Sequence, residues 1–392
     1  MSKKGTLVIS RDQYVRPNKG AVSRIRLSAP SLSNFMPPHL AKHGIEFIHL
    51  GSSSFEPPEF MDGQVLFCLL FAMQHFKEIV VDGSVSEDLV RNATLLQEIW
   101  SCWRPEKYSV VPISATNVFS SRSDQSSVAA WNTIMPFSGG LDSVFTLLRN
   151  TRNEPGRFSV KSVVTALGFD MHLSRREEFK KLVRRIEPVL NDAGVSHRLV
   201  SVNSREFGDF MNWEDSHGLQ IASILHQFSR EFSTALIASS WSANDINIPW
   251  GSTAITDHLM SGSGFRITSD GDGFSRMNKI LAVSNNEEAM RSIKVCWQGK
   301  DLSRNCGICG KCVRTRIRFA VAGFLTPPCF DQPFDPDIID LAETGTNLSS
   351  TITFLADTVR FAKRHGRASA WINRLEVKLK KLRQKMLVNT KK

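Results

Sequence analysis

One short segment combines serines, glycines and an aspartate at a spacing suited to holding a phosphate group. It is Ser138-Gly139-Gly140-Leu141-Asp142-Ser143. An apolar run at 131–137 precedes it, and residues 144–148 have the apolar pattern of the first turns of a helix. Glycine lets the backbone approach an anion closely, and serine hydroxyls add donors beside the N–H groups of a helix N-terminus. We therefore predict a strand, a glycine turn and a helix that together bind a phosphate.

Two other interpretations of this segment are possible. A Walker-type loop requires a lysine next to its last hydroxyl residue, and none is present here. An ordinary Gly-Gly turn with an aspartate that caps a helix would need the same residues. At average residue usage, five fixed residues recur by chance in about one chain in a thousand or fewer. The phosphate-binding interpretation is therefore favoured.

A second group of residues has the spacing of metal ligands. Four of the seven cysteines follow the pattern C-x9-C-x2-C-x2-C, namely Cys296, Cys306, Cys309 and Cys312. Glycines between the last three allow the turns by which neighbouring thiolates converge, and four thiolates form a closed tetrahedral site. The predicted role is structural Zn²⁺.

Three alternatives to zinc remain. An iron–sulfur cluster is possible because C-x2-C-x2-C also begins the bacterial ferredoxin run, although that run continues with Cys and Pro where this chain has Arg316 and Ile317. Redox or sulfur-transfer cysteines are a further alternative. Disulfides are disfavoured because no secretion signal is visible. The isolated Cys68, Cys102 and Cys329 are expected to be buried thiols.

The elements that must position these residues alternate between strand and helix patterns. The expected strands are 132–137, 160–167, 197–202 and 235–239, with helices at 143–150, 176–190 and 217–232. This alternation predicts an α/β fold, a parallel sheet with helices on both faces, whose ligands gather at the carboxyl ends of the strands. We expect Ser138–Ser143, Gly168-Phe169-Asp170 and Ser239-Ser240-Trp241 to meet at one crevice.

The chain divides into four regions by composition. Residues 1–115 are predicted to form an N-terminal α+β accessory domain, with strands at 5–10, 45–50 and 78–81 and a helix capped by Ser86. The serine-rich stretch 116–130 is the expected linker. Residues 131–325 carry the loop and the cysteines, and 326–392 form a helical segment that ends in a basic tail.

The net charge of +11 is concentrated at one end. Residues 361–392 hold seven Lys and four Arg against one acid, 7 + 4 − 1 = +10. Such a tail could contact nucleic acid, and a solvated helix face would have the same composition. The longest apolar run, at 65–73, is about half a membrane span. We expect a cytoplasmic protein without a membrane segment.

The loop and the cysteines together resemble one branch of the N-type ATP pyrophosphatases, the PP-loop superfamily with an adenine nucleotide alpha hydrolase-like fold. Residues 138–143 are similar to its pyrophosphate loop. Residues 296–299 and 305–314 are similar to the zinc motif of 7-cyano-7-deazaguanine synthase, which also lies some 150 residues after the loop. The resemblance covers about residues 131–325.

This resemblance implies ATP and Mg²⁺ as cofactors and a ligase reaction. A substrate carboxylate attacks the ATP α-phosphate, pyrophosphate leaves, and ammonia captures the acyl adenylate to give an amide and then a nitrile. The residues implied in nucleotide binding are Ser138, Gly139, Gly140, Leu141, Asp142, Ser143 and Asp170. Asp142 would position Mg²⁺ or cap the loop, and Lys279 or Arg276 would neutralise developing charge.

Two segments differ from that family. Its Gly-Gln-Arg-His and Pro-Gly-Arg-Asn signatures are replaced by residues 168–172 and 213–218, which place His172 and His217 near the expected crevice. Each histidine, like Asp257, could act on substrate or be satisfied within the packing. The substrate implied is a small carboxylate or modified base, or a macromolecule. Alternative functions are thiolation and a nucleotide-binding module of a defence or modification system that holds a protein partner through its N-terminal region.

Overall fold

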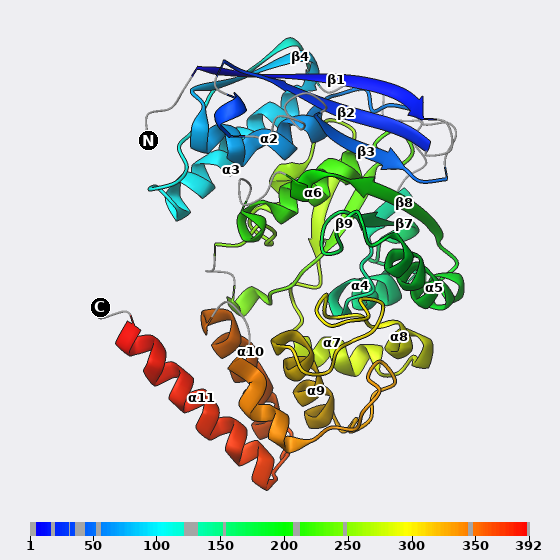
Figure 1. Cartoon of the computed structure of the whole chain (residues 1–392), viewed down its shortest axis with the longest axis vertical. Helices are drawn as coiled ribbons and strands as arrows, with labels where there is room; N and C mark the ends of the chain where they lie inside the picture. The colour runs from blue at the N-terminus through cyan, green and yellow to red at the C-terminus, as the bar shows by residue number, and fades with distance from the viewer. Residues whose placement is uncertain are drawn as a thin grey trace.

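A computed structural model describes residues 5–16, 20–30, 32–35, 44–51, 56–120, 132–151, 154–206, 212–245, 249–343 and 348–389. A ten-stranded sheet in the order β10-β9-β6-β7-β8-β3-β2-β1-β4-β5 runs through the molecule. Helices pack against it, and a helical pair lies at the end opposite to β1 and β4 (Figure 1). The prediction of an α/β fold with a largely parallel sheet is confirmed.

The five strands at one end of the sheet are all parallel. They are β6 (Asn132–Pro136), β7 (Ser159–Leu167), β8 (Ser196–Val202), β9 (Thr234–Ala238) and β10 (Arg266–Asp270). The first four match the strands predicted from the sequence. The structure adds β10, a short strand on the outer side of β9.

The helices between these strands cover both faces of the sheet. Along β6, Ile134 and Met135 point to opposite faces, as alternation in a strand requires, and each joins a different hydrophobic core. α4 (Leu141–Asn150) and α5 (Arg176–Asp192) pack on the Met135 face, whereas α6 (Trp213–His226) packs on the other. Because the chain changes face between β6 and β9, a crevice opens there at the carboxyl ends of the strands.

The N-terminal strands extend the same sheet. They are β1 (Thr6–Arg16), β2 (Gly20–Ser28), β3 (Ile45–His49), β4 (Glu78–Ser86) and β5 (Ile113–Phe119). β3 pairs antiparallel with β8, so hydrogen bonds join the region predicted as an accessory domain directly to the region that carries the loop. Residues 116–119 of the predicted linker belong to β5, and its part at 121–130 lies outside the described residues.

Two helices cover one face of these N-terminal strands (Figure 1). α2 (Asp62–His75) is buried over most of its length because it lies between the strands and α6. α3 (Glu87–Trp103) begins as predicted, since the Ser86 hydroxyl accepts a hydrogen bond from the Leu89 N–H at 3.2 Å. Gly63 lets α2 approach α6, because a Cβ at this position would lie 2.8 Å from the His226 Cβ.

The rest of the chain is helical. α7 (Arg276–Val283), α8 (Glu287–Ser292) and α9 (Gly310–Ala322) pack beneath the sheet, and α10 (Leu348–Arg364) and α11 (Ala370–Asn389) form a hairpin within the segment predicted to be helical (Figure 1). Short 3-10 helices lie at Leu32–Asn34, Ala243–Asp245, Asp257–Met260 and Pro336–Glu343. Within the described ranges, no helix has both the length and the apolar character needed to cross a membrane.

Candidate functional site

The segment 138–143 forms the predicted turn between β6 and α4. Gly139 has a left-handed backbone with φ of +70°, and Gly140 is the N-cap of α4. The Ser138 hydroxyl accepts a hydrogen bond from the Gly140 N–H at 3.3 Å, and the Ser143 hydroxyl donates to the Gly140 carbonyl at 3.0 Å. No side chain caps the first turn of α4. Its N–H groups therefore remain as donors for an anion.

Segments that are distant in sequence contact the loop and hold its backbone in place. The Lys294 N–H donates to the Gly139 carbonyl at 2.7 Å. A Cβ at Gly139 would lie 2.8 Å from Ile186 Cγ2 and 3.4 Å from the Ser292 carbonyl oxygen. A side chain at position 139 would clash with Ile186, and the positive φ would strain the backbone of any residue other than glycine. Glycine is therefore required there.

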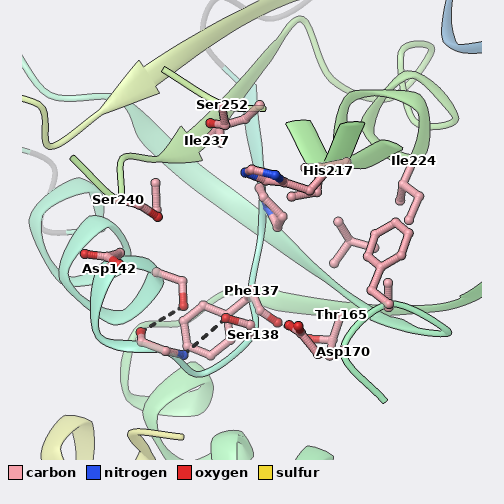
Figure 2. A pocket seen from close by; sticks show the side chains of 18 of the residues that line it. Phe137, Ser138, Asp142, Thr165, Asp170, His217, Ile224, Ile237, Ser240 and Ser252 are labelled. Carbon is pink, nitrogen blue, oxygen red and sulfur yellow. Dashed lines mark hydrogen bonds between the residues drawn. The ribbon is translucent and has the colours of Figure 1, made fainter. Parts of the chain in front are cut away.

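A cavity of about 300 Å³ opens beside the loop. In the view of Figure 2, Ser138, Thr165 and Asp170 lie on one side of it, and His217 and Ser252 on the opposite side. The carboxyl ends of β6, β7 and β9 contribute Ser138, Asp170 and Ser240 to its lining. The structure thus brings the three segments expected at one crevice together.

Aromatic rings form one wall of the cavity. Phe169 and Trp213 have ring centroids 5.1 Å apart, Trp213 and His217 5.8 Å, and His217 and Trp250 5.3 Å. All four line the cavity. Sequence reasoning had named Phe169 and His217 but had given no role to Trp213 or Trp250. A tryptophan at the first residue of a helix after a predicted strand was the available signal.

His217 is held in one tautomer. Burial lowers its pKa below the ordinary value, so the ring is neutral near pH 7. Its Nδ1 lies 3.0 Å from the Trp213 carbonyl oxygen, which can only accept, so Nδ1 carries the proton and Nε2 is left as an acceptor. His172 is exposed and contacts the Ser174 hydroxyl at 2.9 Å instead. Of the two predicted histidines, His217 is the one that lines this cavity.

Asp142 forms ion pairs with two cations at the edge of the loop. Its Oδ2 lies 2.7 Å from Arg276 Nη2 and its Oδ1 3.2 Å from Lys279 Nζ. Burial raises the pKa of Asp142, but attraction to Arg276 and Lys279 outweighs burial and keeps the pKa below its ordinary value. Lys279 is 1% exposed and also donates to the Ser239 carbonyl at the end of β9. The three predicted catalytic residues therefore form one ionised cluster.

Two further arginines extend this cluster. Arg276, Arg314 and Arg318 surround the Phe354 ring at 4.9, 5.6 and 4.9 Å from its centroid, and Trp241 stacks on the same ring. Burial, together with repulsion from Arg276, lowers the pKa of Arg318 to about 9 and that of Arg314 to about 10. Sequence reasoning missed both arginines. Their spacing of four on a helix after the last cysteine was the signal.

The four predicted cysteines converge. One sulfur from each of Cys296, Cys306, Cys309 and Cys312 lies within 4.8 Å of the others. The Cys306 N–H points to Cys296 Sγ at 3.3 Å, and the Cys309 N–H points to Cys306 Sγ at 3.3 Å. Four converging thiols with N–H groups aimed at them form a donor set for a tetrahedral metal ion. Zinc and iron both accept such a set.

The metal-ligand segment also reaches the cavity. Trp297 and Lys311, which lie between the cysteines in sequence, belong to the cavity lining. The buried Lys294 places its Nζ 4.4 Å from the centroid of the Trp297 ring and 3.9 Å from Cys296 Sγ. The segment 294–312 therefore links the cysteine cluster to the loop and to the cavity. The sequence had indicated only its cysteines.

The N-terminal region holds the helix that carries the aromatic wall. Asp215 in the first turn of α6 is 1% exposed. It accepts hydrogen bonds from Arg104 Nε at 3.1 Å, Lys107 Nζ at 2.8 Å and the Tyr108 hydroxyl at 2.9 Å. These donors follow α3 directly. Residues predicted to be accessory thus fix the start of α6, where Trp213 and His217 lie.

A buried carboxyl group supports the segment beside Trp250. Asp257 accepts hydrogen bonds from the Ser252 hydroxyl and the Thr253 N–H, both at 2.9 Å. Burial raises the pKa of Asp257 from 3.8 to about 8. Ser252 lines the cavity, whereas Asp257 is fully buried. This burial favours a role for Asp257 in packing over a role in acting on substrate.

The raised pKa of Asp257 predicts a pH dependence of stability. Because the folded state retains a proton that the unfolded state releases, the stabilisation from Asp257 is complete below its ordinary pKa and is lost as pH rises towards 8. We expect the stability of Asp257→Asn relative to the unchanged chain to increase between about pH 5 and about pH 8. Urea unfolding at a series of pH values measures it. A difference that does not change with pH would contradict the assignment.

Comparison of the chain with protein-family models, with curated proteins and with solved structures finds no match. The choice among possible functions therefore rests on the geometry of the loop, the cavity and the charges around them.

Proposed function

We propose that this chain is an ATP-dependent ligase of the PP-loop type, which activates a carboxylate by adenylation and transfers it to ammonia. The observation that carries the proposal is the position of the loop. A glycine turn with an uncapped helix N-terminus lies at the point where the chain changes face of the sheet, beside a cavity and a pair of cations, the partly exposed Arg276 and the buried Lys279. This arrangement supports the binding of a polyphosphate next to a second substrate.

In the first step, a carboxylate oxygen attacks the α-phosphorus of ATP, and the bond to the bridging oxygen breaks to release pyrophosphate. The loop N–H groups and the Ser138 hydroxyl bind the phosphate oxygens, and the Ser143 hydroxyl can join them by exchanging its hydrogen bond to the Gly140 carbonyl for one to phosphate. Arg276 and Lys279 offset the negative charge that develops on the leaving group, and Arg314 and Arg318 add to the positive potential. Asp142 holds Arg276 and Lys279 in place.

In the second step, the nitrogen of ammonia attacks the acyl carbon, and AMP leaves as its bond to that carbon breaks. The attacking nitrogen must lose a proton. His217 is suited to accept it because its ring is neutral and Nε2 is free of the proton. Asp142 also lines the cavity, but its carboxylate is paired with Arg276 and Lys279, so it takes no part in this transfer.

The cavity supports a planar ring substrate. The wall formed by Phe169, Trp213, His217 and Trp250 offers faces on which a heteroaromatic ring stacks. A cavity of about 300 Å³ is at the small end of ligand sites. We therefore favour a modified base or similar heteroaromatic carboxylate, either free or as the end of a larger molecule.

Two metals belong to the proposal. Mg²⁺ prefers oxygen ligands, and Asp170 in the cavity would hold it together with phosphate oxygens. Asp142 is less suited because Arg276 and Lys279 already occupy its carboxylate. Mg²⁺ would supply charge neutralisation of the triphosphate. Zn²⁺ in the cysteine cluster would be structural, since four thiolates leave no open position.

Thiolation is less well supported. It requires a cysteine that reaches the nucleotide. Among the described residues that line the cavity there is no cysteine, and the sulfurs of Cys296, Cys306, Cys309 and Cys312 are gathered with each other. Measurement of accessible thiols in the metal-loaded chain tests this point, since a reactive thiolate from the cluster would favour sulfur transfer.

The direct test of the proposed function is a product assay. We expect the chain, incubated with Mg-ATP, ammonium and a panel of heteroaromatic carboxylates, to form AMP and pyrophosphate in equal amounts with at least one of them. Omission of the carboxylate should abolish both products. Formation of ADP and phosphate would contradict the proposal, because it would place the attack at the γ-phosphate.

Contacts with macromolecules remain proposals. The basic residues at the end of α10 and in α11 would be the contact for nucleic acid, although Arg374 of α11 already pairs with Asp337 and Asp340, and Lys363 of α10 pairs with Glu376. The N-terminal strands would be the contact for a protein. Binding of DNA and RNA to the chain, with and without the basic residues of α11, tests the first proposal.

A further inference from the structure

A second cavity lies on the side of α5 away from the nucleotide cavity. Its volume is about 320 Å³. It is surrounded by α5, α8, the cysteine segment (residues 294–312) and residues 328–331. α5 and α8 lie side by side (Figure 1). Its lining is mainly charged: Arg184, Arg185, Arg291, Arg304, Glu288 and Asp331. None of these residues takes part in the proposed reaction.

Positive charge in this cavity is incompletely balanced. Arg304 pairs with Asp331, and Arg291 pairs with Glu287. For Arg184 and Arg185 no ion pair occurs with any described residue. Four arginines from three separate segments therefore face one polar space that contains two carboxylates. Arginine clusters of this kind are suited to oxyanions, because each planar guanidinium donates two parallel hydrogen bonds.

Arg185 is the residue that most needs a partner. Its side chain is half-buried, and its Nε is shielded from solvent without a hydrogen-bond acceptor among the described residues. Its only hydrogen bond there is a long one, from Nη2 to the Ile293 carbonyl oxygen at 3.4 Å. Burial lowers the pKa of Arg185, and the attraction to Asp331 and Asp301 does not offset the loss of water. An oxyanion in the cavity would remove this cost.

The walls of this cavity also support the pyrophosphate loop. Ile186, next to Arg185, contacts the position of Gly139, and the Ile293 carbonyl oxygen accepts from Asn305 Nδ2 at 2.9 Å. Lys294, next to Ile293, donates to the Gly139 carbonyl. The same backbone thus separates the arginine cavity from the loop. An anion bound in the arginine cavity would therefore lie behind the loop surface that is proposed to bind the nucleotide phosphates.

We propose that the arginine cavity is a second anion site, which binds a phosphate group through Arg184, Arg185, Arg291 and Arg304. The phosphate can be free or can be the terminal group of a nucleotide, because both present the same doubly charged oxygens. The small size and charged lining of the cavity disfavour an apolar ligand. The site does not depend on the proposed ligase reaction.

The test separates this site from the pyrophosphate loop, which would also bind phosphate. A Ser138→Asp variant places a carboxylate in the loop and should suppress binding there. Calorimetric titration of that variant with inorganic phosphate is expected to show one site per chain. Adding Arg185→Gln and Arg291→Gln should weaken this binding at least tenfold. Titration with AMP forms a second arm, in which binding that is tighter than that of phosphate and is weakened by the same arginine replacements identifies a nucleotide as the source.

The matched control is Arg198→Gln in the same Ser138→Asp background. Arg198 pairs with Glu231 on the surface and does not line the cavity, so phosphate binding should not change. Thermal melting verifies that each variant is folded, and Arg291→Gln alone serves where the double replacement unfolds. Absence of binding in the Ser138→Asp variant, or equal binding after the arginine replacements, would overturn the proposal. Failure of the product assay leaves this result unaffected.

Discussion

Replacement of Asp142 by asparagine is expected to reduce AMP formation by about 10²–10³-fold, the loss typical when a charge-stabilising group is displaced. It should also destabilise the fold by about 3–5 kcal/mol, since a buried cation loses its partner. The cation is Lys279, whose Nζ lies 3.2 Å from Asp142 Oδ1 and whose side chain is 1% exposed. Kinetics of pyrophosphate release and urea unfolding measure the two effects.

A second variant separates the chemical effect from the structural one. In Asp142→Asn combined with Lys279→Met, the unpaired buried charge is absent, so most of the lost stability should return. The rate should remain low because both groups act on the nucleotide site. Lys180→Met is the matched control, since Lys180 pairs with Glu177 on the surface. Recovery of activity in the double variant would refute the role given to this cluster.

Replacement of Cys312 by serine is expected to lower the bound metal below one ion per chain and to reduce the melting temperature by roughly 10 °C or more. The expected size follows from the large folding free energy that structural zinc supplies, on the order of 10 kcal/mol in small domains. Because Lys294 and Trp297 belong to the cysteine segment, ATP binding should weaken as well. Metal analysis, thermal melting and calorimetry measure these effects.

Cys102→Ser is the control for this replacement, because Cys102 lies apart from the cluster and is exposed; the prediction of a buried thiol is wrong for Cys102, although it is confirmed for Cys68 and Cys329. It should leave metal content and melting temperature unchanged. The metal analysis also identifies the ion, since an iron–sulfur cluster would give iron, inorganic sulfide and visible absorption. A Cys312→Ser variant with the same melting temperature as the unchanged protein would show that no metal supports the fold.

Local patterns in the sequence were sufficient for the central strands and for the loop. The strand at 132–137, the glycines and the helix after them are consecutive, and their geometry depends on residues only a few positions apart. The start of α3 at Ser86 was predictable for the same reason. The helix expected at 217–232 instead runs from Trp213 to His226, because Asn212 caps it four residues earlier.

Contacts between distant segments were not predictable from local pattern. The pairing of β3 with β8 joins residues some 150 positions apart, so a region that looked accessory became part of the same sheet. The hydrogen bonds from Arg104, Lys107 and Tyr108 to Asp215 follow from that pairing and from the packing of α2 against both α3 and α6. Nothing in the residues near position 215 indicates these partners.

By itself, the sequence determined the α/β class, the glycine turn between strand and helix at 138–143 and the four cysteines that converge, because each depends on residue types at short and regular spacing. Only the tertiary structure decided which charges meet. It placed Arg276 and Lys279 on Asp142, Arg314 and Arg318 behind them, and four arginines around a second cavity. Electrostatic interactions depend on distance through space and on burial, and these are set when segments far apart in the chain pack together.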